Sequence, residues 1–171
     1  MMYLRMPILI ALLSLFLSVS YGQVDTAWKD WSWLVGTWAG EGSGTPGEGS
    51  GQFSLMPDLN GKVLVRKNHS EYPAAKDRTL IIHDDLMIVY HENTGLPEQA
   101  IYFDNEGHTI RYHVSHTDTS VVFTSEKVQS APVFRLTYDL LAADSISVKF
   151  EMSRDGEKFM TYTEGKCHRV K

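Results

Sequence analysis

Short segments in which apolar and polar residues alternate fill most of this chain, and they constrain its fold more than any other feature. In the segment FRLTYDL, one side carries Phe134, Leu136, Tyr138 and Leu140, and the polar residues fall on the other side. The segment SISVKFEM repeats the pattern. A period of two residues is typical of β-strands that have one buried and one solvated face. The sequence therefore favours sheet over helix along most of its length.

We predict ten strands of this kind, joined by short turns. They cover residues 34–43, 51–56, 62–72, 85–92, 99–104, 109–116, 120–127, 133–140, 145–152 and 159–170. The dipeptides Asn60-Gly61 and Asp155-Gly156 tolerate the positive φ that tight hairpin turns require. A meander of strands leaves two exposed edges unless its first and last strands pair. The sequence therefore predicts an all-β, antiparallel up-and-down barrel of about ten strands, which leaves room for one small ligand.

The N-terminal segment predicts an export signal. One positive charge lies before an apolar run from Ile8 to Leu17, and the small residues of SVSYG follow. The run is shorter than the roughly 20 residues of a membrane-spanning helix. We therefore expect residues 1–22 to be a signal peptide and residues 23–171 to form one lipocalin-like barrel domain with a short helical lead-in. The mature protein would then be periplasmic or extracellular, and an uncleaved N-terminal anchor is the alternative.

The charge balance narrows the range of partners. The chain has a formal net charge of −5 and contains no basic run, so neither nucleic acid nor a membrane surface is an expected partner. Cys167 is the only cysteine, which excludes an intramolecular disulfide. We interpret Cys167 as a small buried side chain on the last strand, with a reactive thiol as the alternative. Asn68 begins an NHS sequon, which matters only in a eukaryotic secretory pathway.

The segment LVGTWAGEGSG places a tryptophan among glycines. Because strand side chains alternate, one face carries Gly36, Trp38, Gly40, Gly42 and Gly44. If Trp38 points inward, the glycines add no bulk to the interior and let the sheet bend sharply. We therefore predict that Trp38 closes one end of the barrel while the glycines leave open volume beside it. The alternative is a segment that is merely flexible.

This glycine-rich segment resembles the G-x-W motif of the calycin superfamily, which comprises lipocalins, fatty-acid-binding proteins and bacterial relatives. It is closer to the G-x-W-x-G-x-G-x-G stretch of the nitrobindin-like haem-binding barrels. Arg169 matches the basic residue that covers the tryptophan in calycins, and the resemblance implies a cation–π contact with Trp38. The middle of the chain resembles uncharacterised bacterial lipocalin-like domains. The resemblance implies a calycin-like barrel with an internal ligand.

The nitrobindin resemblance also implies haem held by a histidine on the last strand. The corresponding segment here, FMTYTEGKC, contains no histidine. His168 follows it, but alternation places His168 on the face opposite Arg169. We therefore expect no cofactor and keep haem as an alternative.

Polar aromatic residues on the expected inward faces are candidates for ligand binding. Tyr90, Tyr112 and Tyr138 share strand faces with apolar neighbours, and their hydroxyls would orient a ligand by hydrogen bonds. We expect Arg66 and His116 to join them, and Arg66 would suit a carboxylate. The sequence thus predicts that these five residues hold a small hydrophobic or amphipathic molecule. The alternative is a filled barrel that acts only as a surface module.

Metal-binding and nucleophilic motifs are absent from the sequence. It has neither the G-x-S-x-G nor the H-E-x-x-H pattern. His113 and His116 are an odd number of residues apart on one expected strand, so they point to opposite faces. His83, Asp84 and Asp85 are expected in a loop before a strand. We therefore predict no metal site.

An enzyme is the alternative to a binding protein. A Tyr–His or Tyr–Glu pair inside the barrel would support acid–base chemistry of the isomerase or lyase type, with Tyr112 and His116 as its candidates. The carboxyl groups of Glu71, Glu92 and Asp104 are expected near the barrel mouth. Since no motif specifies a reaction, we predict ligand binding rather than catalysis.

Overall fold

The computed structural model describes residues 26–44, 47–76, 79–91, 99–129 and 131–171. The predicted signal peptide and Glu92 lie outside these ranges. Ten antiparallel strands form a closed barrel in which each strand pairs with its neighbours in sequence and the first pairs with the last. The predicted all-β antiparallel barrel is confirmed. No helix in the described ranges has the length and hydropathy to cross a membrane.

A short 3₁₀-helix precedes the strands, which agrees with the predicted short helical lead-in. The elements are η1 (Thr26–Trp31), β1 (Gly36–Gly44), β2 (Gly49–Asp58), β3 (Val63–Tyr72), β4 (Ile81–Tyr90), β5 (Gln99–Asp104), β6 (Thr109–His116), β7 (Ser120–Ser125), β8 (Val133–Ala142), β9 (Ser145–Ser153) and β10 (Met160–Arg169). All ten predicted strands are present. The largest error is at β4, which begins four residues before the predicted start at Asp85.

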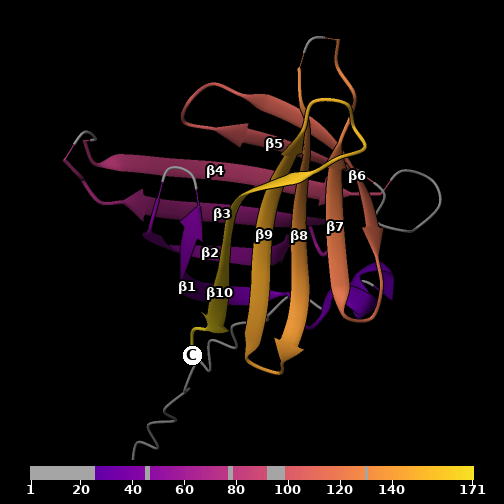
Figure 1. Cartoon of the computed structure of the whole chain (residues 1–171). Helices are drawn as coiled ribbons and strands as arrows, with labels where there is room; N and C mark the ends of the chain where they lie inside the picture. The colour runs from indigo at the N-terminus through magenta and orange to yellow at the C-terminus, as the bar shows by residue number, and fades with distance from the viewer. Residues whose placement is uncertain (1–25, 45–46, 77–78, 92–98, 130) are drawn as a thin grey trace, which may run out of the picture.

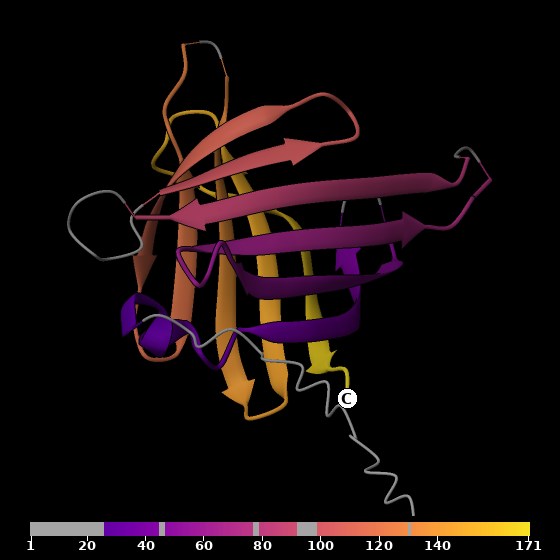
Figure 2. The ribbon, with the colours of Figure 1, turned by 180° about the vertical axis from the view of Figure 1, so that it is seen from behind.

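The barrel is flattened into two crossing layers with a plug at one end. Strands β2, β3 and β4 run across β7, β8 and β9, as Figure 1 and Figure 2 show from opposite sides. The η1 helix lies beside the turn between β6 and β7. Its residues Trp28 and Trp31 are fully buried, and the Trp31 ring packs 5.9 Å from the Phe123 ring. This end of the barrel is therefore closed by indole rings.

Trp38 and Arg169 join the start of the barrel to its last strand. Trp38 is fully buried, and its Nε1 donates a hydrogen bond to the Leu34 carbonyl at 2.8 Å. The Arg169 guanidinium lies 4.2 Å from the centre of the Trp38 ring, which confirms the predicted cation–π contact. The same guanidinium donates to the carbonyls of Trp33 at 2.6 Å and Val35 at 2.7 Å. These bonds fix the lead-in against β10.

The glycines of β1 allow β10 to approach closely. A Cβ at Gly40 would overlap the carbonyl oxygen of Lys166, and one at Gly42 would lie 2.8 Å from that of Glu164. At Gly36 the φ of 140° favours glycine, and a Cβ there would overlap the Arg169 guanidinium. Gly40 and Gly42 also line the interior cavity, as predicted. The glycines of β1 therefore let β1 and β10 pair closely and also leave open volume in the cavity.

We expect Gly40→Ala to lower the free energy of unfolding by about 1–3 kcal/mol, because the new methyl group must displace backbone of β10. Urea unfolding monitored by tryptophan fluorescence measures the change. Glu41→Ala is the control, since Glu41 is exposed on the same strand and its loss should cost less than about 0.5 kcal/mol. Equal stability of the two variants would contradict this account of the β1–β10 contact.

Candidate ligand-binding cavity

The barrel contains a cavity of about 1130 Å³. Its lining includes the turn between β5 and β6, from Glu106 to Thr109. His116, at the other end of β6, instead packs 6.0 Å from the ring of Trp31 in η1. The cavity therefore occupies the part of the barrel away from the indole plug.

One wall of the cavity is apolar. Strands β6, β8 and β9 supply its side chains, which are Ile110, Phe134, Leu136, Val148, Phe150 and Met152. The rings of Phe134 and Phe150 stack with their centres 5.7 Å apart, and Tyr162 meets Phe150 edge-on at 6.0 Å. This wall offers a flat aromatic surface to the body of a ligand.

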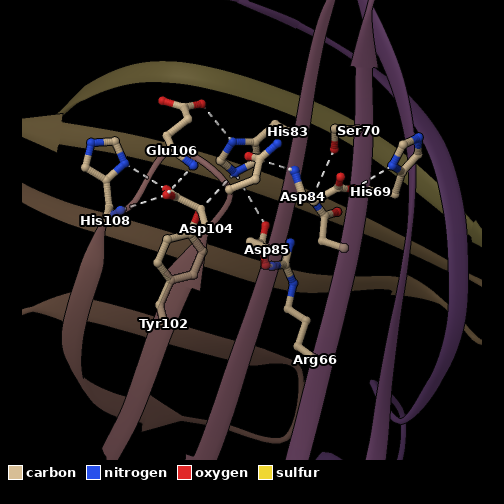
Figure 3. Close-up of polar contacts among 12 residues, drawn as sticks. Arg66, His69, Ser70, His83, Asp84, Asp85, Tyr102, Asp104, Glu106 and His108 are labelled. Carbon is tan, nitrogen blue, oxygen red and sulfur yellow. Dashed lines mark hydrogen bonds and ion pairs between the residues drawn. The ribbon is translucent and has the colours of Figure 1, made fainter.

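The facing wall is polar and comes from three consecutive strands. Strands β3, β4 and β5 contribute Arg66, Asn68, Ser70, His83, Asp85, Tyr102 and Asp104. Figure 3 shows how ion pairs and hydrogen bonds connect several of these side chains. Asn68, the sequon residue, donates to the Ser70 hydroxyl at 3.2 Å on this inward face. The cavity is thus two-sided rather than uniformly apolar.

Arg66 and Asp85 form a buried ion pair in this wall. Their side chains are only 8% and 3% exposed, and Arg66 Nη1 donates to Asp85 Oδ1. Burial opposes the charge of the guanidinium, but Asp85, Tyr138 and Tyr102 together outweigh burial and raise the pKa of Arg66. We expected the positive charge of Arg66 to bind a ligand carboxylate. In the structure, the Asp85 carboxylate already compensates that charge.

His83 links the ion pair to the barrel mouth. Its Nε2 lies 2.9 Å from the Tyr102 hydroxyl, and its Nδ1 lies 3.1 Å from Glu106 Oε1. Contact with the Asp85 carboxylate raises the pKa of His83; burial opposes this rise, and Glu106 reinforces it. Burial raises the pKa of Tyr102, and the carboxylates of Asp85 and Asp104 raise it further. Tyr102 therefore stays a neutral hydroxyl beside a readily protonated imidazole.

Asp104 organises the turn at the mouth. It accepts hydrogen bonds from the backbone N–H groups of Glu106 at 3.0 Å and His108 at 2.9 Å. Asp104 Oδ2 lies 2.8 Å from Nδ1 of His108 and accepts a hydrogen bond from the Tyr102 hydroxyl at 3.3 Å. Burial opposes ionisation of Asp104, but the bonds from His108 and Glu106 outweigh it and lower the pKa. The prediction of a carboxyl group at the mouth is met by Asp104, whereas Glu71 is half-exposed and pairs with His69.

The five predicted ligand residues occupy four different environments. Arg66 and Tyr112 line the cavity, and burial raises the pKa of Tyr112. Tyr138 is fully buried outside the cavity lining, and burial raises its pKa to about 12. His116 points inward but lies at the plug, away from the cavity. Only part of the predicted set therefore meets in one place.

Tyr90 was assigned to the wrong face. In β4 the buried residues near it are Met87 and Val89, so Tyr90 and Ile88 project from the opposite, outer face. Tyr90 is accordingly not part of the cavity lining. The apolar character of Ile88 misled the prediction because both faces of this strand carry apolar residues.

Sequence reasoning missed His83, Asp85 and Tyr102. The predicted loop before β4 is in fact strand, so His83 and Asp85 point into the barrel and Asp84 points out. The signal was present as an alternation that places Ile81, His83, Asp85, Met87 and Val89 on one face. Polar residues on an inward face are expected where the strand borders a cavity.

The last strand does not offer a haem ligand of the kind that the nitrobindin resemblance implies. Towards the cavity β10 presents Gly165 and Cys167, while His168 is exposed on the opposite face. Cys167 is half-buried, and burial raises the pKa of its thiol. The residues of β10 therefore do not fit an iron held by a last-strand histidine.

Comparison with known proteins finds chains of similar structure but none of similar sequence. Rv2717c from M. tuberculosis aligns with a TM-score of 0.60 and 15% identity over 87% of this chain and 100% of its own. The S-type phycobiliprotein lyase CPES from Guillardia theta aligns with a TM-score of 0.49 and 8% identity over 82% of this chain and 90% of its own. No family model and no curated protein matches the sequence. The likeness to Rv2717c supports the fold described above, a closed ten-stranded antiparallel β-barrel, which fits the calycin-like barrel expected from the sequence.

Proposed function

We propose that this protein binds a small amphipathic molecule inside its barrel. The observation that carries the proposal is the cavity of about 1130 Å³ with an aromatic wall facing a hydrogen-bonding wall. Cavities of this order hold drug-sized ligands, which are mostly buried and are oriented by a few polar groups. The body of the ligand packs on Phe134 and Phe150, and its polar end reaches His83 and Tyr102.

Replacing Val148 by tryptophan tests this proposal. Val148 points into the cavity, whereas its neighbour Lys149 points out and is 39% exposed. N-phenyl-1-naphthylamine, a neutral probe that fluoresces in apolar sites, reports occupancy. We expect Val148→Trp to weaken probe binding at least about tenfold, because the indole fills the space that the probe needs. Lys149→Trp is the matched control and should leave the dissociation constant unchanged.

The same experiment has a clear negative result. If the wild-type protein does not bind the probe, or if both tryptophan variants bind it equally well, the cavity is not the binding site. Native mass spectrometry of the purified protein supplies an independent view, since a co-purified ligand appears as a mass adduct.

We further propose that the barrel works outside the cytoplasm after cleavage of the predicted signal peptide. The charged start, short apolar run and small-residue exit of residues 1–22 support this proposal. The mass of the protein isolated from its native cell tests it. A chain that retains residues 1–22 would contradict cleavage.

A further inference from the structure

Acidic side chains predominate around the cavity. Of its described lining, Glu41, Glu164 and Arg111 are exposed at outward strand positions, which leaves four carboxylate residues against one arginine: Asp85, Asp104, Glu106 and Glu126 against Arg66. Two histidines, His83 and His108, also line the cavity. Because a concave surface of one sign concentrates the field, this excess favours ligands of positive charge.

The excess is strongest in the polar wall itself. Together with Glu106 and His108 of the adjoining β5–β6 turn, this wall sets three carboxylates (Asp85, Asp104 and Glu106) against one guanidinium (Arg66) and two imidazoles. The Arg66 guanidinium compensates only one of these three carboxylates. The side chains of Asp85 and Asp104 are only 3% and 4% exposed, so water screens their charges weakly. The polar wall therefore presents a net negative charge to the cavity.

Arg66 does not offset this field for an incoming anion. Its Nη1 is engaged by Asp85, and its Nε, although without a hydrogen-bond partner among the described residues, is buried from the cavity surface. A ligand carboxylate would lie near Asp104 and Glu106 without a free cation on this wall. Repulsion and desolvation both disfavour that arrangement.

The aromatic lining is a second observation that points to a cation. Seven rings border the cavity, from Phe53, Tyr72, Tyr102, Tyr112, Phe134, Phe150 and Tyr162. Tyr102 and Tyr112 meet at right angles with ring centres 6.3 Å apart. The Tyr102 hydroxyl lies next to the Asp104 carboxylate, as Figure 3 shows. Aromatic faces attract ammonium groups, and carboxylates nearby add to that attraction. The combination suits a cation that carries apolar substituents.

We infer that the cavity selects a cationic amphiphile, an organic amine whose ammonium group lies at the Asp85–Asp104–Glu106 wall and whose apolar body lies on Phe134 and Phe150. This inference rests on the proposed function, because it assigns a charge to the molecule that the barrel binds. It reverses the carboxylate ligand expected from Arg66 alone.

The position of His83 among carboxylates makes this selectivity depend on pH. His83 faces Asp85 on its own strand, Tyr102 on β5, and Glu106 at the turn. His108 pairs with Asp104 at the same turn. Protonation of the His83 imidazole places a positive charge among these carboxylates and removes part of the attraction for an amine. Amine binding therefore weakens as pH falls. Since the pKa of His83 is raised, the loss begins at a higher pH than for a free histidine.

Displacement of N-phenyl-1-naphthylamine by decylamine, decanol and decanoate tests the inference, because the three differ only in the head group. Each is used below its micelle concentration. At about pH 8 we expect decylamine to bind at least about tenfold more tightly than decanoate, with decanol between them. Lowering the pH to about 6 should reduce the advantage of decylamine over decanol about threefold or more.

A matched pair of variants locates the effect. Glu106 and Glu71 are similarly exposed, at 54% and 52%, but only Glu106 lines the cavity. We expect Glu106→Gln to reduce the preference for decylamine over decanol several-fold and Glu71→Gln to leave it unchanged. An equal reduction in both variants would assign the preference to net charge rather than to the cavity and would overturn the inference.

The remaining outcomes separate this inference from the proposed function. If decanoate displaces the probe as well as or better than decylamine, the inference is wrong while the proposed function stands. The same holds if the probe binds but none of the three compounds displaces it. If the probe itself does not bind, the proposed function fails and the inference fails with it.

Discussion

Trp38→Ala lowers the free energy of unfolding by about 3–5 kcal/mol, the cost of removing a fully buried large aromatic side chain. The substitution removes a packed ring, the hydrogen bond from its Nε1 to Leu34, and the surface on which the Arg169 guanidinium lies. Arg169 then covers a void at the junction of β1 and β10. Denaturant unfolding followed by far-UV circular dichroism measures the loss without relying on tryptophan fluorescence.

His168→Ala is the control for this prediction. His168 precedes Arg169 on β10 but is exposed on the outer face, so its removal should change stability by less than about 0.5 kcal/mol. Arg169→Met adds a second measurement, since it keeps an apolar chain over the indole but removes the bonds to Trp33 and Val35. A loss below about 1 kcal/mol for Trp38→Ala would show that this end of the barrel does not depend on the indole.

Asp85→Asn is expected to cost about 3–5 kcal/mol, because it leaves the Arg66 guanidinium buried without a counter-charge. The amide of asparagine keeps the size of the side chain, so the loss reports charge rather than packing. Thermal and denaturant unfolding measure the change. Asp84→Asn is the matched control on the adjacent, outward position, where the side chain is 53% exposed and its ion pair with His69 contributes at most about 1 kcal/mol.

A double substitution separates the net value of the ion pair from the cost of breaking it. We expect Arg66→Met combined with Asp85→Leu to recover most of the stability lost in Asp85→Asn, since no isolated charge then remains buried. Failure to recover would mean that packing around Phe53, whose ring centre lies 5.3 Å from the guanidinium carbon, dominates the effect. A loss of less than about 1 kcal/mol in Asp85→Asn would contradict a buried pair.

The fold could be predicted because its signals are local. Each strand that buries one face shows a period of two in the sequence, and turns such as Asn60-Gly61 carry residues that accept positive φ, which Asn60 and Gly61 both adopt. The contact of Trp38 with Arg169 was implied by the resemblance of the G-x-W segment to calycins, in which a basic residue of the last strand covers the tryptophan. These predictions needed no knowledge of how side chains meet inside the barrel.

The errors arose where local polarity and barrel position disagree. His83 and Asp85 looked like loop residues because they are polar, yet a strand that borders a cavity can carry polar side chains on its inward face. Tyr90 looked inward because Ile88 is apolar, but β4 has apolar residues on both faces, so alternation alone did not select one. In each case the local pattern permits two answers, and only packing against neighbouring strands selects between them.

The sequence by itself determined the number of strands, their antiparallel order and most of their limits, because these follow from short-range periodicity and from the ends of a meander. The Trp38–Arg169 contact came from the resemblance of the G-x-W segment to calycins. Only the tertiary structure decided the character of the cavity. The contacts of Arg66 with Asp85 and of His83 with Tyr102 join residues 19 positions apart. Such contacts depend on the register between strands and on the curvature of the barrel. Neither is encoded in the alternation of a single strand. Only the tertiary structure therefore reveals that Asp85 compensates the charge of Arg66 and that the polar wall carries a net negative charge.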